Sequence, residues 1–369
     1  DFKPSQSILM VGDLNDEAAT KANTSTFRIK WVMNATLIFD TYNYITMLQD
    51  PVPSVYGGVA GSGLKSDVEF EYMRMNGDTI FMKGFKYKND LVLVKANATQ
   101  KSRYLSSAFK ANIDAITSFF VTKRNNYVNI QGLTNPVEFI LDKSSKTAKF
   151  QYQSNEGNVA QVTAKYSYED DGVVFDDGFT VGGVTFVRGK IENGEFVLIA
   201  ADGTKYTLKQ STLPVVPMSL MFVYNGAYKE LYLGTSLPAG VTSGFNTAWQ
   251  SAVTKLAALS PTRTIVDLRF ILTNSTTATV TLRTTNGTVF TANATWQYTY
   301  NNGILTLSNP SYDGNWTPRQ PQIQEIQNFF NSGPFKVDYV LSSNPNVTGL
   351  GGLYRVADNT SFFYGTLKK

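Results

Sequence analysis

The alternation of apolar and polar residues predicts one β-strand after another between Ser7 and Lys95. Stretches rich in β-branched and aromatic residues place an apolar side chain at every second position, as strands with one buried face do. Asn76-Gly77 predicts a two-residue type I′ hairpin, which would place Glu71 opposite Met82 and Glu69 opposite Gly84. The predicted strands are Ser7–Val11, Ser25–Val32, Thr36–Asp40, Asp67–Met75, Thr79–Lys83 and Leu91–Lys95.

Three stretches change to a helical spacing. Apolar residues recur at intervals of three and four over Lys101–Lys123, Thr242–Leu259 and Gln320–Asn331. Pro261 follows the second stretch and predicts its end. Further predicted strands lie between the helices, separated by turns that contain Gly and Asn. Because an amphipathic helix must bury its apolar stripe, we expect these helices to lie on sheets.

One block of sequence returns later in the chain. The segment from Glu138 to Phe175 aligns with Arg269–Leu307, and Phe139 matches Phe270 at an offset of 131 positions. The offset changes by a single residue along the block, as small changes in loop length would produce. The opening residues of the chain fit the same template more faintly. The pattern therefore predicts a repeated structural unit.

The repeat and the element order together predict an α+β protein of tandem units. We expect each unit to be a helix packed on a mostly antiparallel β-sheet. We also expect Phe139 and Phe270 to be equivalent and buried. The predicted units are residues 1–97, with its helix missing, 98–212 and 240–369, with connecting strands over 213–239.

The composition removes several kinds of chemistry. The 369 residues contain no cysteine and no histidine. Disulfides, thiolate nucleophiles, Cys/His zinc sites and catalytic triads with a histidine base are therefore excluded. We expect no cofactor and no tightly held transition metal, because the chain offers neither imidazole nor thiolate. A net charge of +4 is too dilute over this length to indicate a nucleic-acid partner.

Three carboxylates alternate along one predicted strand. Asp67, Glu69 and Glu71 would point to one face, while the apolar residues between them point to the other. Such a row could bind a hard cation or supply the carboxylate pair of a glycosidase. A solvated face neutralised by neighbouring lysines is the simpler interpretation and the one we favour, but the expected pairing of Glu71 with Met82 and of Glu69 with Gly84 keeps the site interpretation open.

Aromatic residues fall into two groups. Trp296, Tyr298 and Tyr300 share one strand face, as do Tyr166 with Tyr168 and Phe27 with Ile29 and Trp31, and their recurrence favours core positions. Aromatics in loops that do not repeat are better candidates for exposed platforms; these are Tyr42, Tyr44 and Tyr56 near the Gly- and Pro-rich segment Asp50–Gly63, and Tyr312 with Trp316.

These observations suggest one candidate site. The segment Tyr42–Leu64 has no counterpart of similar composition in the second unit, and it lies close in sequence to the acidic strand at Asp67. We expect any ligand to contact this loop and the acidic face. The candidate ligand-binding residues are Tyr42, Asn43, Tyr44, Tyr56, Asp67, Glu69 and Glu71.

Three motifs carry a resemblance to a known family: Leu37-Ile38-Phe39-Asp40-Thr41-Tyr42-Asn43, Asp67-Val68-Glu69-Phe70 and Phe81-Met82-Lys83-Gly84-Phe85-Lys86. Over about Ser7–Lys95 the chain resembles surface lipoproteins of Bacteroidetes that have no assigned function. Members often read Phe at the position of Val68 and often carry a histidine shortly after the equivalent of Asn43, which this chain lacks.

The resemblance implies where the protein works. It implies export, lipidation on a cysteine upstream of residue 1, and a place at the outer membrane or cell surface. No signal peptide is present and the chain opens directly on a strand, as a mature fragment does. Membrane attachment would then come only through that upstream anchor. Some members lie near genes for starch-utilisation-type transporters, which implies an outer-membrane transporter as partner.

Two main classes of function remain open. We expect a non-catalytic surface binding protein that captures glycan or another small nutrient. The alternative is a glycoside hydrolase that uses the Asp67, Glu69 and Glu71 carboxylates, and a structural or adhesive surface role is a third reading. An open aromatic platform would favour binding, whereas two carboxylates about 5–10 Å apart in a cleft would favour hydrolysis.

Overall fold

The chain is mostly β. The computed structural model describes residues 1–31 and 33–369, with 45% of the chain in strands and 18% in helices. It forms two compact bodies. The N-terminal body comprises residues 1–123, 141–148 and 163–208, and the C-terminal body comprises residues 124–140, 149–162 and 209–369.

The predicted α+β fold of helix-on-sheet repeats is therefore wrong. The strands form a six-stranded sheet, a nine-stranded sheet and a closed barrel. The physical reason is that hairpins continue to pair with new neighbours instead of ending under one helix each. In the barrel, Leu231 of β16 (Glu230–Leu233) pairs with both Phe270 of β17 (Thr264–Leu272) and Leu367 of β23 (Asp358–Lys368).

The six-stranded sheet of the N-terminal body confirms the predicted run of strands. Its strands follow chain order and pair antiparallel. Ile8, Leu37, Phe39, Phe70 and Met82 form the buried cluster on one face. Val32, at the end of the strand predicted over Ser25–Val32, lies outside the described residues. The strands are β1 (Ser7–Met10), β2 (Asn23–Trp31), β3 (Ala35–Phe39), β4 (Glu69–Asn76), β5 (Thr79–Gly84) and β6 (Asp90–Val94).

The register of the β4–β5 hairpin differs from the expected one. Asn76 pairs with Thr79, as a two-residue turn requires, but the register shifts between Tyr72 and Arg74. The turn residues are Gly77 and Asp78 instead of the expected Asn76 and Gly77. This turn position and the extra residue together place Glu71 opposite Lys83, where the expected register had Met82. A β-bulge of this kind depends on side-chain packing, and the turn sequence alone does not reveal it.

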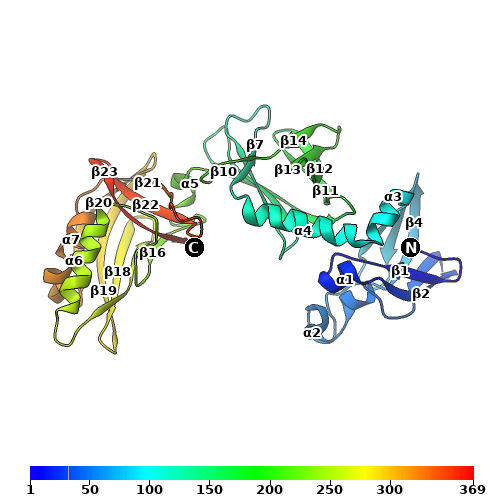
Figure 1. Cartoon of the computed structure of the whole chain (residues 1–369), viewed down its shortest axis with the longest axis horizontal. Helices are drawn as coiled ribbons and strands as arrows, with labels where there is room; N and C mark the ends of the chain where they lie inside the picture. The colour runs from blue at the N-terminus through cyan, green and yellow to red at the C-terminus, as the bar shows by residue number, and fades with distance from the viewer. Residues whose placement is uncertain (32) are drawn as a thin grey trace. The chain divides into compact units, whose positions relative to one another are not determined.

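The helix predicted over Lys101–Lys123 is two helices in the structure, α3 (Ala98–Tyr104) and α4 (Ser107–Thr122). The break occurs because the Ser106 hydroxyl accepts a hydrogen bond from the Ala108 backbone N–H and starts a new helix. In Figure 1, α4 runs beside β12 of the same body, and the Phe119 ring packs 5.9 Å from that of Phe196. The body's remaining short helices are α1 (Asp16–Thr20), η1 (Thr46–Gln49) and α2 (Pro53–Tyr56).

The nine-stranded sheet has the order β14-β13-β12-β11-β10-β9-β8-β7-β15. Most of it is a meander, because short Gly- and Asn-containing turns connect successive strands. It consists of nine strands. They are β7 (Asn126–Val128), β8 (Val137–Asp142), β9 (Thr147–Gln153), β10 (Val159–Tyr168), β11 (Val173–Val181), β12 (Val184–Glu192), β13 (Glu195–Ala200), β14 (Lys205–Thr207) and β15 (Lys209–Gln210).

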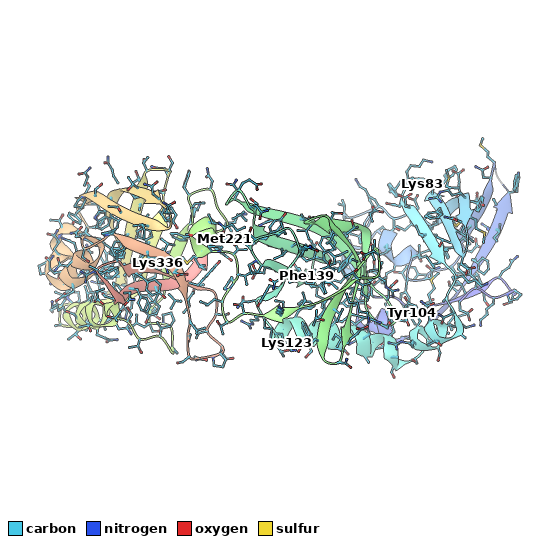
Figure 2. The ribbon with its side chains drawn as sticks, turned by 90° about the horizontal axis from the view of Figure 1, so that it is seen from above. Lys83, Tyr104, Lys123, Phe139, Met221 and Lys336 are labelled. Atoms are coloured by element: carbon cyan, nitrogen blue, oxygen red, sulfur yellow. The ribbon has the colours of Figure 1, made fainter. Side chains whose placement is uncertain are left out.

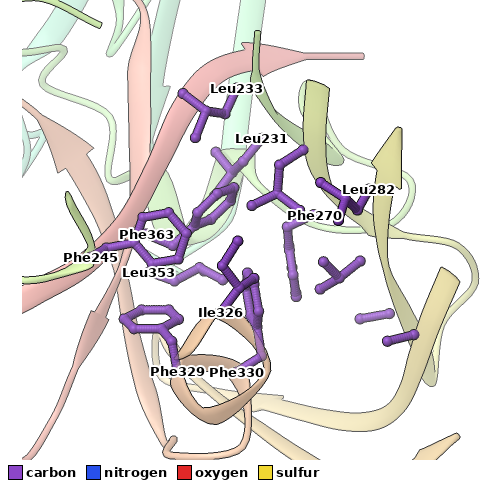
Figure 3. Close-up of a cluster of buried hydrophobic side chains, with 14 of the residues drawn as sticks. Leu231, Leu233, Phe245, Phe270, Leu282, Ile326, Phe329, Phe330, Leu353 and Phe363 are labelled. Atoms are coloured by element: carbon purple, nitrogen blue, oxygen red, sulfur yellow. The ribbon is translucent and has the colours of Figure 1, made fainter. Parts of the chain in front are cut away.

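The barrel of the C-terminal body encloses a large apolar core. Figure 3 shows Phe329 and Phe330 of α7 (Gln320–Phe330) lying near Phe245, Phe270 and Phe363. Helices α6 (Phe245–Ala257) and α7 lie side by side (Figure 1). The other elements are α5 (Met218–Met221), η2 (Thr317–Arg319), β18 (Thr277–Thr285), β19 (Val289–Asn301), β20 (Ile304–Tyr312), β21 (Phe335–Val340) and β22 (Leu350–Arg355).

Burial separates the predicted core aromatics. Phe139, Phe270, Trp296, Tyr298, Tyr166 and Tyr168 are buried, which confirms those predictions. Trp31 is 80% exposed, so its predicted core position is wrong. The reason is that β1 pairs with β2 only as far as Thr26, and the segment that carries Ile29 and Trp31 extends past it.

The predicted exposure of Trp316 is wrong. This residue was expected in an exposed loop, but its side chain is fully buried. Its indole Nε1–H donates to Oε1 of Gln327 on α7 at 2.9 Å, and its ring stacks on Tyr312. The loop therefore uses this aromatic residue as an anchor.

Candidate functional site

The segment Tyr42–Leu64 is an ordered loop in the N-terminal body. Asn43 is only 1% exposed, and its side-chain oxygen accepts hydrogen bonds from the backbone N–H groups of Ile45 and Thr46 at 2.9 and 3.0 Å. Its amide also donates to Ser25 Oγ at 3.1 Å. Such an Asx-type arrangement starts η1 and holds the beginning of the loop against β2.

The three loop tyrosines use their hydroxyl groups within the protein. Tyr42 donates to Asp50 Oδ2 at 2.8 Å, Tyr44 to the Lys21 carbonyl at 2.6 Å, and Tyr56 to the Leu14 carbonyl at 3.0 Å. Tyr42 is 55% exposed, so its ring offers a face to solvent. Aromatic stacking at Tyr42 is therefore the contact that this loop could still make with a ligand.

Asp67 holds a turn together. Its carboxylate accepts hydrogen bonds from the backbone N–H groups of Lys86, Tyr87 and Asn89 at 2.7, 2.8 and 3.1 Å. Burial would raise the pKa of Asp67, but these backbone bonds outweigh it and hold the pKa below its ordinary value. An ionised, fully engaged carboxylate is poorly suited to act as the general acid of a glycosidase.

The other two acids of the row lie in different surroundings. Glu69 is exposed, and Glu71 is partly buried opposite Lys83. Lys83 forms its ion pair with Asp90, at 2.8 Å. Among the residues that the structure describes, no group of three acidic side chains is placed to hold a metal ion. The ligand-binding role of the loop and the acidic row stays a prediction.

The C-terminal body contains a cavity of about 390 Å³ that the sequence did not indicate. This volume is within the range of small-molecule sites. All of its lining residues belong to the C-terminal body. They come from strands β8, β9, β10, β21, β22 and β23 and from the end of α5 at Met221 (Figure 2). The rest are Arg124 and Asn125, just before β7, and residues in the segments around Leu213, Tyr228 and Val347.

Glu138 is the central feature of this cavity. It is 6% exposed, and among the described residues no donor lies within hydrogen-bonding distance of its carboxylate. The carboxylate oxygens are not enclosed by protein atoms. Its carboxylate therefore opens onto the cavity that it lines.

Two phenol groups lie close to this carboxylate. Tyr228 and Tyr339 line the same cavity, and the described residues supply no hydrogen-bond partner for either hydroxyl. Burial raises the pKa of Tyr228 and of Tyr339, and the negative charge of Glu138 raises both further. The site thus brings together one acceptor and two hydroxyls that are free to bond a ligand.

A short hydrogen-bond chain forms a second polar side of the cavity. Lys149 Nζ donates to Gln151 Oε1 at 3.1 Å, and Gln161 Nε2 donates to the same oxygen at 2.7 Å. Arg124 Nη1 donates to Thr348 Oγ1 at 2.7 Å. An ammonium group has three N–H donors, so Lys149 keeps donors available for a ligand.

Burial sets the electrostatics of Glu138. It raises the pKa of the carboxyl above its ordinary value, and the positive charge of Lys149 opposes part of that rise. Among the described residues, no cation lies within 4.0 Å of the carboxylate to form an ion pair. A ligand that donates hydrogen bonds or carries positive charge would stabilise the ionised form.

One sequence signal could have pointed to Glu138. It is a charged residue inside the apolar strand Val137–Leu141, where burial without a partner is costly. Its neighbours in the cavity gave no such signal. Tyr228 and Tyr339 lie far away in sequence, and only the tertiary fold brings them together.

A family model described as a domain of unknown function (DUF4302) matches residues 1–192. No curated protein matches the chain. The described residues include no helix that is long and apolar enough to span a membrane.

Proposed function

The chain belongs to the DUF4302 family, whose description assigns no function, and we propose that it is a non-catalytic binding protein that captures glycan or another small nutrient. The observation that carries this proposal is the cavity of the C-terminal body. Its acceptor at Glu138 and its hydroxyls at Tyr228 and Tyr339 are left unpartnered among the described residues. Pockets that bind small polar molecules combine a few such groups with apolar walls.

Hydrogen bonds to these groups would stabilise a bound ligand. These groups face the cavity and are open to direct bonding. A hydrogen bond contributes about 0.5–1.5 kcal/mol between neutral groups and about 1.5–3 kcal/mol to a charged group. A ligand with several O–H or N–H groups would form such bonds with Glu138 and both tyrosines. The apolar remainder of the wall, including Ile140, Val340 and Leu350, would bury the ligand's carbon skeleton.

Binding fits this cavity better than hydrolysis does. A glycosidase needs two carboxyl groups on either side of the scissile bond. Among the residues that line the cavity, Glu138 is the sole carboxylate. The cavity therefore lacks the second carboxylate of that mechanism.

The proposed setting comes from the resemblance over Ser7–Lys95. We propose that the protein is exported, held at the outer membrane or cell surface by a lipid upstream of residue 1, and works beside an outer-membrane transporter. A surface receptor of this kind needs reversible binding and no chemistry of its own, in keeping with the cavity.

A thermal-unfolding screen tests the proposal. Neutral oligosaccharides and small nitrogenous nutrients would be added to the wild-type protein, since a ligand at 100 times its Kd stabilises the folded state by about 2.7 kcal/mol. The double variant Y228F/Y339F keeps both rings and removes both hydroxyls. We expect at least one ligand to raise the wild-type midpoint and to raise it less in the variant. Turnover of a bound saccharide, or no stabilising ligand at all, would refute the proposed function.

A further inference from the structure

We propose that the cavity binds a zwitterionic ligand, an apolar amino acid or short peptide, with its ammonium group at Glu138 and its carboxylate toward Lys149 and Arg124. This inference rests on the proposed function and names the class of nutrient. It follows from the charges that line the cavity, from the groups left unpaired there, and from the apolar surface beside them.

The Glu138 end is suited to an ammonium group. Its carboxylate is buried and lacks a donor among the described residues, while Tyr228 and Tyr339 stand beside it. An N⁺–H···O⁻ hydrogen bond is roughly twice as strong as a neutral one. Aromatic rings add a favourable interaction with a cation that lies over their faces. A ligand ammonium would therefore supply the partner that the protein leaves out.

The other polar side of the cavity is positively charged. Lys149 donates to Gln151 at 3.1 Å, and the exposed Arg124 donates to Thr348 at 2.7 Å. No described carboxylate lies within ion-pairing distance, 4.0 Å, of either. Each retains N–H donors that a ligand carboxylate could accept from.

The presence of both signs of charge in one cavity, without an ion pair, selects the ligand class. Glu138 and Lys149 line one cavity and interact through space, yet they do not form an ion pair. A simple cation would be repelled by Lys149 and Arg124, and a simple anion would be repelled by Glu138. A ligand with opposite charges at its two ends complements both sides at once.

Apolar residues also line the cavity. Ile140, Leu213, Val340, Leu350 and Leu367 all line the cavity. Such a surface favours an aliphatic side chain, because burial of apolar area stabilises a complex by about 25 cal/mol per Å². Leucyl-leucine combines both charged ends with two aliphatic side chains and is a suitable probe.

The test compares ligands that differ by one charge. Isothermal titration calorimetry on the full chain would measure leucyl-leucine, its N-acetyl derivative without the ammonium, and its C-terminal amide without the carboxylate. We expect each loss of charge to weaken binding at least tenfold, which corresponds to about 1.4 kcal/mol. Thermal unfolding of each variant used would confirm that it is folded.

Variants locate the ammonium contact. In Glu138→Gln, leucyl-leucine should bind at least tenfold more weakly, and acetylation should have little further effect. Glu69→Gln, which removes an exposed carboxylate in the N-terminal body, serves as the matched control and should leave binding unchanged. Equal loss in both variants would contradict the placement at Glu138.

The outcomes separate this inference from the proposed function. If neutral oligosaccharides stabilise the protein and leucyl-leucine does not bind, the proposed zwitterionic ligand class is wrong, whereas the proposed binding function stands. If acetylated and free dipeptide bind equally, the ammonium contact is wrong. If neither class of ligand binds, both proposals fall.

Discussion

The Phe270 ring stacks on the Phe330 ring, with 6.0 Å between ring centroids and 10° between ring planes. This contact joins strand β17 of the barrel to helix α7, with strands β18, β19 and β20 between them in sequence. Both side chains are fully buried. The barrel core and its covering helix are thus one packed structure.

Phe270→Ala should lower the free energy of unfolding by about 3–5 kcal/mol, the usual cost of truncating a buried Phe. The substitution removes the contacts of the ring with Phe222 and Phe330 and leaves a cavity. It also removes the hydrophobic free energy gained when the ring is buried. Chemical denaturation at neutral pH measures the change. A loss below about 1 kcal/mol would be typical of a surface residue and would contradict the burial.

Asp67→Asn should destabilise the protein by about 1–3 kcal/mol at pH 7. The NH₂ of the new amide would face N–H groups that donate to the wild-type carboxylate, and an NH₂ group cannot accept those hydrogen bonds. The folded pKa of Asp67 is lowered, so its contribution is present above the unfolded pKa of about 3.9 and is lost as pH falls through the folded value. The difference in the free energy of unfolding between wild type and Asp67→Asn should therefore shrink below about pH 4. Glu69→Gln is the control and should stay within about 0.5 kcal/mol at any of these pH values.

Gly84→Ala should cost more stability than Gly77→Ala. A Cβ at Gly84 would lie 2.1 Å from Asp67 Oδ2, so it would displace the carboxylate that holds the 86–89 turn. A Cβ at Gly77 meets nothing within 4 Å, and the cost there is the positive φ of 54°, about 1–2 kcal/mol. Comparison of the two unfolding midpoints checks the order, and a smaller effect at Gly84 would be inconsistent with the tight contact to Asp67.

Glu138→Gln should make the protein more stable at pH 7, by about 1–3 kcal/mol, because it removes an unpartnered buried carboxylate. The folded pKa of Glu138 is raised, so wild-type stability is fully present below the unfolded pKa of about 4.3 and falls as pH rises through the folded value. Burial causes this rise in the pKa of Glu138, and Lys149 opposes it. Tyr228 and Tyr339 face the same cavity, and burial, with the charge of Glu138 adding to it, raises the pKa of each. Chemical denaturation at pH 4 and pH 7 measures how much larger the free energy of unfolding is in Glu138→Gln than in wild type. This difference should be greater at pH 7. A smaller difference at pH 7 than at pH 4 would contradict the prediction.

The loop hypothesis makes a separate prediction. If Tyr42, Tyr44 and Tyr56 contact the ligand, their joint replacement by alanine should weaken its binding. Because the three hydroxyls also hold the loop, the triple Phe variant is needed as a control that keeps the rings. Unchanged affinity in folded triple-alanine protein would place the site outside this loop.

Local sequence determined much of the secondary structure. Alternation in the first ninety-five residues predicts the strands that β1 to β6 occupy, because the period of two is a property of each strand by itself. The spacing of Phe109, Ile113 and Ile116 likewise predicts the buried face of α4. The burial of Phe139 and Phe270 was also predictable, since large aromatic residues inside apolar strands have few other places to lie.

Tertiary structure alone decided which strands share a sheet and which side chains are covered. The barrel closes because β16 pairs with β23, more than a hundred residues later, and no local pattern specifies that contact. The same holds for the exposure of Trp31, the burial of Trp316 and the cavity that joins Glu138 to Tyr228 and Tyr339. Pairing and burial at such distances depend on the free energy of the whole assembled core, whereas periodicity along the chain records only the preference of each segment for a strand or a helix.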